Sequence, residues 1–313
     1  MDIVALGTVA MDVILQVDSL PSEDGFALIK ERNYMDGGSA ANVIVQAQRL
    51  GASCGLIAQV GDDEIGKAII GGLDKEGVDT TSMVIKQGGS SLHTTIVVGE
   101  NGKKFILLNM GDSFLNLKAC DVKSRYLTSS KIFYTDLIPG EPAFYALKLA
   151  KEAGLKTVVN IQIGIPMMEQ FGIKRKDILD ALSYVDVFAP CREAFYQLTE
   201  TEDHMLGIKS FMKTYKGLLL LTLGSSGSIS SQNGELIDLP SFKVEALDTT
   251  GAGDSYLGAF IYSYLVRNMK LKEAMHFSSA AAALTCKAVG ARSSRNLSEV
   301  EEFAGKLSEE VKK

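Results

Sequence analysis

Short apolar runs alternate with amphipathic helical segments along most of this chain, and this alternation restricts its fold more than any other feature. Apolar runs separated by segments of helical periodicity are typical of βαβ units, in which helices connect parallel strands. We therefore expect an α/β fold with a parallel sheet. The predicted strands are residues 3–6, 53–60, 131–134, 157–159, 185–189 and 218–221.

Glycine follows four of the predicted helices. Beyond a helix the chain often takes a left-handed conformation, which glycine adopts without strain. Three more helices are predicted near the C-terminus, the last beginning with Ser298 and Glu301, the pair of a capping box. The predicted helices are residues 41–50, 65–76, 142–153 and 204–216, followed by Gly51, Gly77, Gly154 and Gly217, and then residues 255–268, 272–288 and 298–312.

Two regions interrupt this alternation and have the pattern of β-hairpins. Residues 13–35 hold two apolar runs around a Pro-Ser-Glu-Asp-Gly turn, and residues 93–109 hold two around a Gly-Glu-Asn-Gly-Lys turn. Both lie outside the βαβ succession, so we expect a small antiparallel sheet that stands apart and acts as a lid. The lid would consist of segments at about 12–36 and 90–110.

Charge and composition limit the partners of the protein. A net charge of −6 argues against nucleic-acid binding, which needs a basic face. No apolar stretch reaches the roughly 18 residues of a membrane span, and the N-terminus lacks the basic region of a signal peptide. The cysteines have no paired spacing, so neither a zinc site nor disulfides are expected. We expect a cytoplasmic protein with reduced thiols at Cys54, Cys120, Cys191 and Cys286.

Residues 248–258, Asp-Thr-Thr-Gly-Ala-Gly-Asp-Ser-Tyr-Leu-Gly, give the strongest indication of chemistry. Gly251, Ala252 and Gly253 leave the backbone bare just before a helix, so their N–H groups can converge on one anion. Asp254 follows where a substrate hydroxyl would meet that anion, which is the position of a general base in phosphoryl transfer.

A tight turn with a helix-capping aspartate explains the same residues. Three further features favour phosphate binding. Asp248 and Asp254 flank the loop, two threonines precede its first glycine, and Gly258 would leave a notch one turn into the helix. A helix cap requires none of these.

A second glycine-containing segment, Gly-Gly-Ser-Ala-Ala-Asn at residues 37–42, also precedes a predicted helix. Asn42 offers a donor and an acceptor, which suits a sugar hydroxyl, and Asp12 beyond the first strand could accept from further hydroxyls. A flexible turn would account for Gly37 and Gly38 on their own. Together with the 248–258 loop, they favour an acceptor site.

Polar or small residues follow four of the predicted strands, at Asp136, Asn160, Cys191 and 222–224. Ligands collect at such strand ends in open parallel sheets, although a strand that simply ends in water has the same pattern. The segment 61–68 is close to a P-loop, but alanine replaces the hydroxyl that Mg²⁺ needs and acidic residues fill the loop. We interpret it as a strand-to-helix turn.

The two glycine-containing segments, in this order, resemble the signatures of the ribokinase-like (PfkB) carbohydrate kinase family. That family has an N-terminal Gly-Gly signature, matched by residues 37–42, and a C-terminal Asp-Thr-x-Gly-Ala-Gly-Asp signature, matched in full by residues 248–254. The resemblance covers essentially the whole chain. It implies one kinase domain over residues 1–313, a three-layer α/β/α sandwich with a mostly parallel sheet and a small antiparallel β lid.

The resemblance also implies transfer of the ATP γ-phosphoryl group to an alcohol, with Asp254 as the base and the backbone of Gly251, Ala252 and Gly253 as the anion hole. Other roles follow by position. Asp12, Gly37, Gly38 and Asn42 would bind the acceptor, Thr222 and Gly224 the nucleotide, and Asp248, Thr250 and backbone near Gly290 a monovalent cation such as K⁺.

One segment departs from the family pattern. Members usually carry Asn-x-x-Glu after a strand that ends in proline, where it helps to organise Mg²⁺ and phosphate. This chain has Pro190-Cys191-Arg192-Glu193-Ala194, so that Glu193 stands one residue early. Either Glu193 or water compensates at the Mg²⁺ site, or turnover is weaker than in the family at large.

The acceptor stays open between a sugar and a nucleoside. A nucleoside base would need an aromatic platform from the lid, where Phe26, Tyr34 and Phe105 are available. For an acceptor that already bears phosphate, a basic residue would suit the position of Ser39, which slightly disfavours such a substrate. However, Lys30 and Arg32 on the lid could serve such a phosphate, so a phosphorylated acceptor is not excluded.

The alternative from another functional class is a non-catalytic protein that binds sugar or nucleotide. A homodimer through the lid sheets is expected, because an exposed sheet favours pairing.

Overall fold

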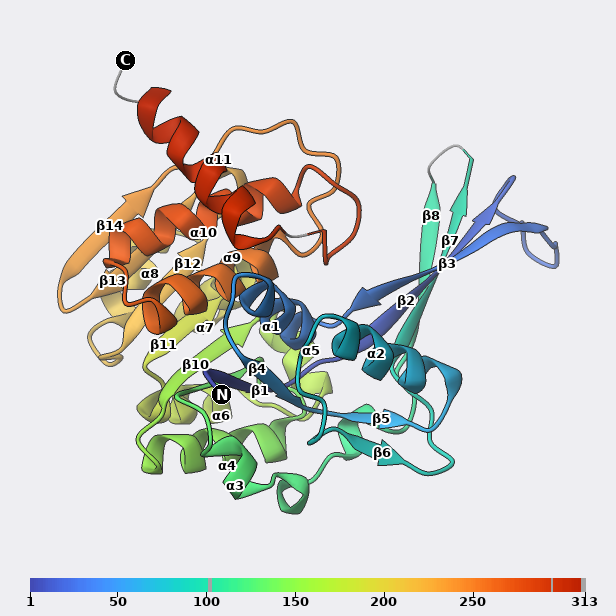
Figure 1. The fold of residues 1–313 in the computed structure, drawn as a ribbon, viewed down its shortest axis with the longest axis horizontal. Coiled ribbons are helices and arrows are strands. Elements are labelled where there is room, and N and C mark those ends of the chain that lie inside the picture. The colour runs from blue at the N-terminus through green and yellow to red at the C-terminus, as the bar shows by residue number, and fades with distance from the viewer. Residues whose placement is uncertain (101–102, 294, 311–313) are drawn as a thin grey trace.

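The structure is a computed structural model that describes residues 1–100, 103–293 and 295–310. An eight-stranded sheet lies between two layers of helices, which makes a three-layer α/β/α sandwich (Figure 1). Its strands, in their order across the sheet, are β14 (Glu235–Leu239), β13 (Ser228–Gln232), β12 (Leu218–Thr222), β11 (Val187–Pro190), β10 (Lys156–Ile161), β9 (Ile132–Thr135), β1 (Ile3–Leu6) and β4 (Cys54–Ile57).

Pairing within this sheet is mostly parallel, as predicted. All pairs from β12 to β4 are parallel, and only the β12–β13 and β13–β14 pairs are antiparallel. Strand β1, which lies beside the edge strand β4, is fully buried, with Ile3 and Ala5 in one core cluster and Val4 and Leu6 in the other. A strand covered on both faces is apolar at every position, which explains its unbroken apolar sequence.

The two helical layers cover opposite faces of the sheet. One layer consists of α1 (Ser39–Arg49), α2 (Glu64–Lys75), α9 (Ala252–Phe260), α10 (Leu271–Thr285) and α11 (Leu297–Glu310). The other consists of α3 (Ser124–Leu127), α4 (Gly140–Glu152), α5 (Ile165–Gln170), α6 (Arg175–Ala181), α7 (Arg192–Thr199) and α8 (His204–Phe211). No helix in the described ranges is long and apolar enough to cross a membrane.

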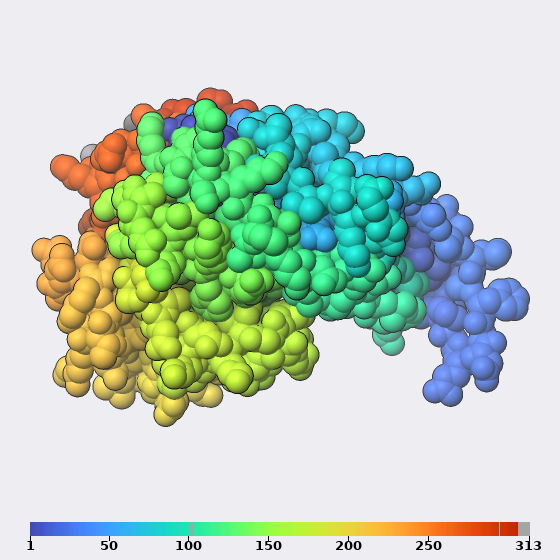
Figure 2. All heavy atoms as spheres, turned by 90° about the horizontal axis from the view of Figure 1, so that it is seen from below, coloured from blue at the N-terminus to red at the C-terminus, as the bar shows by residue number. Residues whose placement is uncertain are grey.

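A second sheet, which we call the small sheet, projects from this body (Figure 1). Its strands, in spatial order, are β3 (Ile29–Gly37), β2 (Ala10–Val17), β7 (His93–Gly99) and β8 (Lys104–Asn109). The β2–β3 and β7–β8 pairs are antiparallel, which confirms both predicted hairpins, whereas β2 and β7 run parallel. In the space-filling view, the β2–β3 end extends well beyond the rest of the surface (Figure 2).

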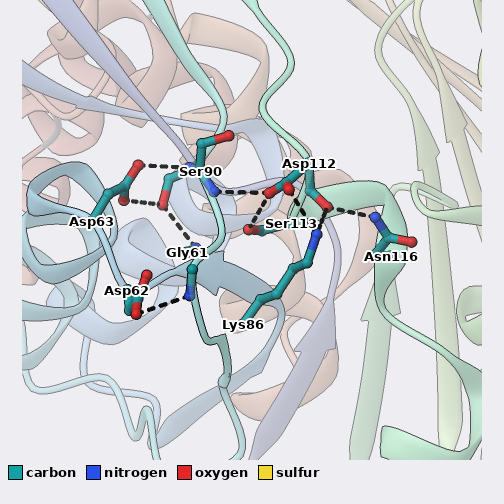
Figure 3. Close-up of polar contacts among 10 residues, drawn as sticks. Gly61, Asp62, Asp63, Lys86, Ser90, Asp112, Ser113 and Asn116 are labelled. Carbon is teal, nitrogen blue, oxygen red and sulfur yellow. Dashed lines mark hydrogen bonds and ion pairs between the residues drawn. The ribbon is translucent and has the colours of Figure 1, made fainter.

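Polar side chains beside β5 (Gln59–Gly61) and β6 (Val84–Lys86) fix the base of the β7–β8 hairpin (Figure 3). The carboxylate of Asp112, just after β8, accepts the N–H of Ser90 at 2.8 Å and pairs with Lys86 Nζ at 2.8 Å. Asp63 accepts the hydroxyl of Ser91 at 2.6 Å. The small sheet therefore leaves the body from a hydrogen-bonded base.

Several predicted boundaries are confirmed by the backbone. Gly51, Gly77 and Gly154 have positive φ angles after their helices. The segment 61–68 is the predicted strand-to-helix turn, since Asp63 caps α2 by accepting the N–H of Gly66 at 2.7 Å.

Other boundaries were wrong. The predicted strand 53–60 is two strands, because β4 pairs with β1 whereas β5 pairs with β6 in a separate sheet. Helix α8 ends at Phe211, and a Cβ at Gly217 would lie 2.3 Å from Tyr215 Oη, so this glycine serves close packing rather than a helix stop. The reciprocal capping contacts of α11 join Asn296 and Glu299, at 3.1 Å each, instead of Ser298 and Glu301.

Candidate active site

The three glycines of residues 248–258 serve three different structural purposes. Gly251 begins α9 with φ +75°, and a Cβ there would lie 2.5 Å from the Ala291 carbonyl oxygen. A Cβ at Gly258 would lie 2.4 Å from the Val43 carbonyl oxygen, so this residue is the predicted notch, at which α9 packs closely on α1. A Cβ at Gly253 would meet nothing within 4 Å, so its surroundings are open.

Asp254 lies in the first turn of α9 and is buried. Three side chains donate to its carboxylate, each at 2.8 Å: Ser39 and Gln162 to Oδ1, and Asn42 to Oδ2. The predicted base and the predicted acceptor residue Asn42 are therefore direct neighbours. The contacts of Ser39 and Gln162 with Asp254 were not predicted; the only signal for Gln162 is its place two residues after the polar strand end at Asn160.

Burial raises the pKa of Asp254 to about 6, even though the hydrogen bonds from Asn42 and Ser39 favour the ionised form. The nearby charge of Asp136 raises this pKa further, and that of Arg292 lowers it. A carboxylate with a pKa near 6 is ionised at neutral pH and is more basic than an exposed aspartate.

Asp136, at the end of β9, is a second buried carboxylate, and burial raises its pKa to about 6 as well. Its oxygens accept the N–H of Thr8 at 2.9 Å and that of Ile138 at 3.1 Å. A Cβ at Gly7 would lie 2.5 Å from its Oδ1. Asp136 therefore holds the turn between β1 and β2.

Asp12 lies on β2 of the small sheet and accepts a hydrogen bond from the hydroxyl of Thr94 on β7. A Cβ at Gly37 would lie 3.4 Å from Asp12 Oδ2, so the Gly-Gly segment passes close to this carboxylate. Gly38 has φ +88°, and a Cβ would lie 2.6 Å from the Thr8 carbonyl oxygen. These three predicted acceptor residues are thus brought together where the small sheet meets α1.

A cavity of about 520 Å³ lies beyond the N-terminus of α9, at the end of β12. Thr222, Gly224, Ala252 and Gly253 all line it, so the predicted nucleotide residues share one cavity with the glycine loop. The N–H of Ala252 donates to the Thr249 carbonyl at 3.2 Å. By helix geometry, the N–H groups of the next two residues have no partner within the helix.

Asp248 is held at the other end of the loop. Its carboxylate accepts the N–H of Thr250 at 2.9 Å, the hydroxyl of Thr250 at 2.7 Å and the N–H of Gly290 at 2.9 Å. Burial raises the pKa of Asp248, but these hydrogen bonds and the charge of Lys104 outweigh it and lower the pKa below its ordinary value. The carboxylate is therefore anionic, and the loop from 248 to 250 is tied to the 290 turn.

The Cys191–Ala194 segment begins α7. Cys191 Sγ accepts the N–H of Ala194 at 3.4 Å and caps the helix, and this cysteine lines a cavity of about 30 Å³ beside Gly253. Glu193 is exposed and its Oε1 accepts from Gln197 Nε2 at 3.2 Å. Among the residues that the structure describes, no group of three or more His, Cys, Asp or Glu side chains could hold a metal ion.

The sequence matches the pfkB family of carbohydrate kinases over residues 1–298. It is 31% identical over 304 residues to an ATP-dependent ribose-1-phosphate kinase from Halopiger xanaduensis, covering 96% of this chain and 97% of that one. It is 29% identical over 318 residues to a ribokinase from Schizosaccharomyces pombe, covering 94% of each.

A solved structure has the same fold. Arabidopsis thaliana ribokinase, complexed with ribose and ATP, superposes with a TM-score of 0.80 at 21% identity, covering 97% of this chain and 98% of that one. The family match spans both glycine-containing segments and the small sheet. The chain therefore has the ribokinase-like fold and belongs to the pfkB family of carbohydrate kinases, phosphotransferases that use an alcohol group as acceptor.

Proposed function

We propose that this protein transfers the γ-phosphoryl group of ATP to a hydroxyl, most simply a primary hydroxyl, of a sugar, with Asp254 as the general base. The observation that carries this proposal is the position of Asp254. It lies beside Asn42 of the acceptor segment on one side, and in the first turn of the helix whose start lines the 520 Å³ cavity on the other. A base there can reach a hydroxyl that faces a bound phosphate.

The chemistry of Asp254 follows from its surroundings. Its pKa of about 6 leaves it ionised at neutral pH, and three donors fix its orientation. It would take the proton of the acceptor hydroxyl as the oxygen attacks phosphorus. Within the predicted anion hole, the N–H groups of Gly251 and Gly253, with the helix N-terminus, would stabilise charge on the transferring group, whereas the N–H of Ala252 already donates to the Thr249 carbonyl. ATP would supply the phosphoryl group, and Mg²⁺ would neutralise charge on its phosphates.

The acceptor would bind between Asp12, Gly37, Gly38 and Asn42, beneath the small sheet. Strand register places Asp12, Thr94 and Leu108 on one face of that sheet, and Tyr34 and Phe105 on the other. Two of the three aromatic candidates for a nucleoside platform thus lie away from Asp12, and the third, Phe26, is 92% exposed. This distribution favours a sugar over a nucleoside.

A phosphorylated sugar stays within the proposal, because one relative is named for ribose-1-phosphate. Of the two lid cations considered from the sequence, Lys30 pairs with Glu100, and Arg32 lies on the face away from Asp12. Lys104 lies on the Asp12 face and acts electrostatically on Asp248. It is the candidate to meet a phosphate on the acceptor.

Thr222 and Gly224 would bind the nucleotide in the 520 Å³ cavity. In the part of the chain that the structure describes, no group of three or more His, Cys, Asp or Glu side chains could hold Mg²⁺, which fits an ion held mainly by ATP phosphates and water. Glu193 would contribute through water, although it does not line the small cavity at Gly253. Asp248 and Thr250, with backbone near Gly290, would hold a monovalent cation such as K⁺.

The small sheet would close over the acceptor as a lid and exclude water, the competing acceptor. It also carries exposed apolar side chains on both faces of β8, with Ile106 at 54% and Leu107 at 57% exposure. Exposed apolar edges are usually covered. We therefore propose a homodimer in which the small sheets of two copies cover each other.

Release of ADP, measured by a coupled assay, tests the proposed function. The panel contains ribose, fructose, ribose-1-phosphate and adenosine, each with Mg²⁺ and with or without K⁺. ADP release with a sugar supports the proposal, and K⁺ stimulation supports the cation site. Turnover with adenosine alone would establish a nucleoside kinase. Binding of sugar or nucleotide without ADP release across the panel would instead establish the non-catalytic alternative.

A further inference from the structure

We propose that Arg292 is a positioning residue for phosphoryl transfer, which holds the carboxamide of Asn42 so that its amide nitrogen faces Asp254. The inference rests on the proposed function, because it matters to catalysis only if Asp254 is the base. Arg292 follows the turn at Gly290, between α10 and α11, and no pattern in the sequence around it predicts a contact with α1.

The guanidinium of Arg292 contacts three groups. Its Nε donates to Asn42 Oδ1 at 3.0 Å, and its Nη2 donates to the Gly37 carbonyl at 3.0 Å. Its Nη1 lies 3.5 Å from Asp36 Oδ2, an ion pair without a hydrogen bond. The side chain is 7% exposed, so water is largely excluded from these contacts.

These contacts determine which way the Asn42 carboxamide points. A guanidinium has donors only, so the group facing it must be the carboxamide oxygen. The NH₂ group of Asn42 must then point to the opposite side, where it donates to Asp254 Oδ2 at 2.8 Å. Without Arg292, the oxygen could turn to Asp254 and repel its ionised carboxylate.

The same side chain connects the base to the small sheet. Asp36 and Gly37 are the last residues of β3, so Arg292 links that strand end to the first turns of α1. The carbonyl of Arg292 itself accepts from Arg49 Nη1 at 2.7 Å, which holds the loop against α1. A planar fork fits two acceptors at once, whereas a lysine ammonium at this place would reach one of them at a time.

Charge acts in the same direction as geometry. The charge of Asp136 raises the pKa of Asp254, and that of Arg292 lowers it. The phenol of Tyr134 also lies near both carboxylates, and burial raises its pKa well above the ordinary value, so it stays neutral. Removing Arg292 should therefore raise the pH at which Asp254 becomes ionised.

Steady-state kinetics across pH test this inference with the variants Arg292→Gln and Arg292→Lys. For Arg292→Gln we expect kcat to fall by about tenfold to a hundredfold, the scale of a misplaced catalytic group, while KM for ATP changes little. The acid limb of kcat/KM should move upward by at least about half a pH unit. Arg292→Lys keeps the charge, so its acid limb should stay near that of the wild type although kcat falls.

Arg175 offers a matched control. This partly buried arginine lies on α6, in the helical layer opposite α9, and its Nη2 donates to the Leu198 carbonyl at 2.7 Å. Arg175→Gln should lower the melting temperature without moving the acid limb. If Arg292→Gln behaves like this control, with normal kcat and an unmoved acid limb, the inference is wrong. If Arg292→Gln does not fold, the kcat of Arg292→Lys is compared with that of the wild type instead, and a normal kcat contradicts the inference.

A double-mutant cycle tests whether Arg292 acts through Asn42. In an Asn42→Ala background, changing Arg292 to Lys should lower kcat by less than about threefold, because the group it positions is gone. Equal losses in both backgrounds would contradict the inference. If Asp254→Asn is active, Asp254 is not the base and the proposed function fails at that point. If Asp254→Asn is inactive but the Arg292 variants have normal kinetics, only the role of Arg292 is contradicted.

Discussion

The carboxamide of Asn42 donates to Asp254 Oδ2 at 2.8 Å, although the two residues are 212 positions apart. This contact joins the first turn of α1 to the first turn of α9, and so joins the two glycine-containing segments of the chain. The close packing that Gly258 permits against Val43 makes the contact possible. An acceptor site and a phosphate site thereby meet at one carboxylate.

Gly251 and Gly253 form a matched pair for mutation to alanine. Gly251→Ala should destabilise the protein by several kcal/mol, because φ is +75° and the new Cβ would meet backbone at 2.5 Å. Gly253→Ala should leave the melting temperature unchanged or slightly higher, since its Cβ meets nothing within 4 Å and alanine favours a helix. We expect Gly253→Ala nevertheless to lower kcat about tenfold or more, through crowding of the bound phosphate. Thermal unfolding and kinetics on the same two preparations check this, and wild-type kinetics in Gly253→Ala would exclude the anion hole.

Activity should depend on pH through Asp254. The base must be ionised, and its pKa is about 6, so kcat/KM should fall roughly tenfold per pH unit below that value. A pH profile of the purified enzyme measures this limb. An acid limb near pH 4, the range of an exposed aspartate, would show that the base is not the buried Asp254.

The same burial should affect stability with a definite sign. Asp136 and Asp254 have folded-state pKa values raised from 3.8 to about 6, so the folded state binds protons more tightly than the unfolded state. Their contribution to the free energy of unfolding is full below about pH 4 and is lost as pH rises through 6. Denaturant titrations at pH 4.5 and 7 should show a smaller difference for Asp254→Asn than for the wild type. An equal difference would contradict the shifted pKa of Asp254.

Gln162 should matter to the reactivity of Asp254, although no sequence pattern identifies it. Its Nε2 donates to Asp254 Oδ1 at 2.8 Å, and a hydrogen bond to a charged group contributes about 1.5 to 3 kcal/mol. Gln162→Met keeps the size but removes the donor, so we expect kcat to fall about tenfold and the acid limb to move upward. Gln232→Met, at the end of β13, serves as the control and should leave both unchanged. Normal kinetics in Gln162→Met would make this contact irrelevant to the base.

The proposed homodimer can be tested by mass. Light scattering should give twice the chain mass for the wild type and one chain mass for the double variant Ile106→Lys, Leu107→Lys, whose exposed side chains lie on the small sheet. Leu206→Lys on α8 is a matched control, since Leu206 is 60% exposed but lies outside that sheet. A monomeric wild type, or a double variant that remains dimeric, would contradict the proposed interface.

Local sequence patterns predicted the parts of the fold that depend on local rules. Apolar runs predicted the bounds of β1, and turn residues between apolar runs predicted the existence of both hairpins. The notch at Gly258 was predicted from its spacing in α9. The break between β4 and β5 did not, because it depends on which sheet each half joins. Local patterns give a strand but not its partner.

The site divides in the same way. Asp254 and Asn42 lie in segments with a recognisable pattern, and their positions were predicted together. Gln162 and Arg292 reach the site from a strand end and from a loop, and only the packing of distant elements brings them there. Each is held by a hydrogen bond across more than 90 positions of the chain, which no local pattern encodes.

The most direct test of the account is the turnover of Asp254→Asn with an accepted sugar. Because the variant keeps the shape of the side chain but cannot take a proton, kcat should fall by roughly two to four orders of magnitude, while sugar binding and the circular dichroism spectrum stay near those of the wild type. Turnover close to that of the wild type in this variant would show that Asp254 is not the base.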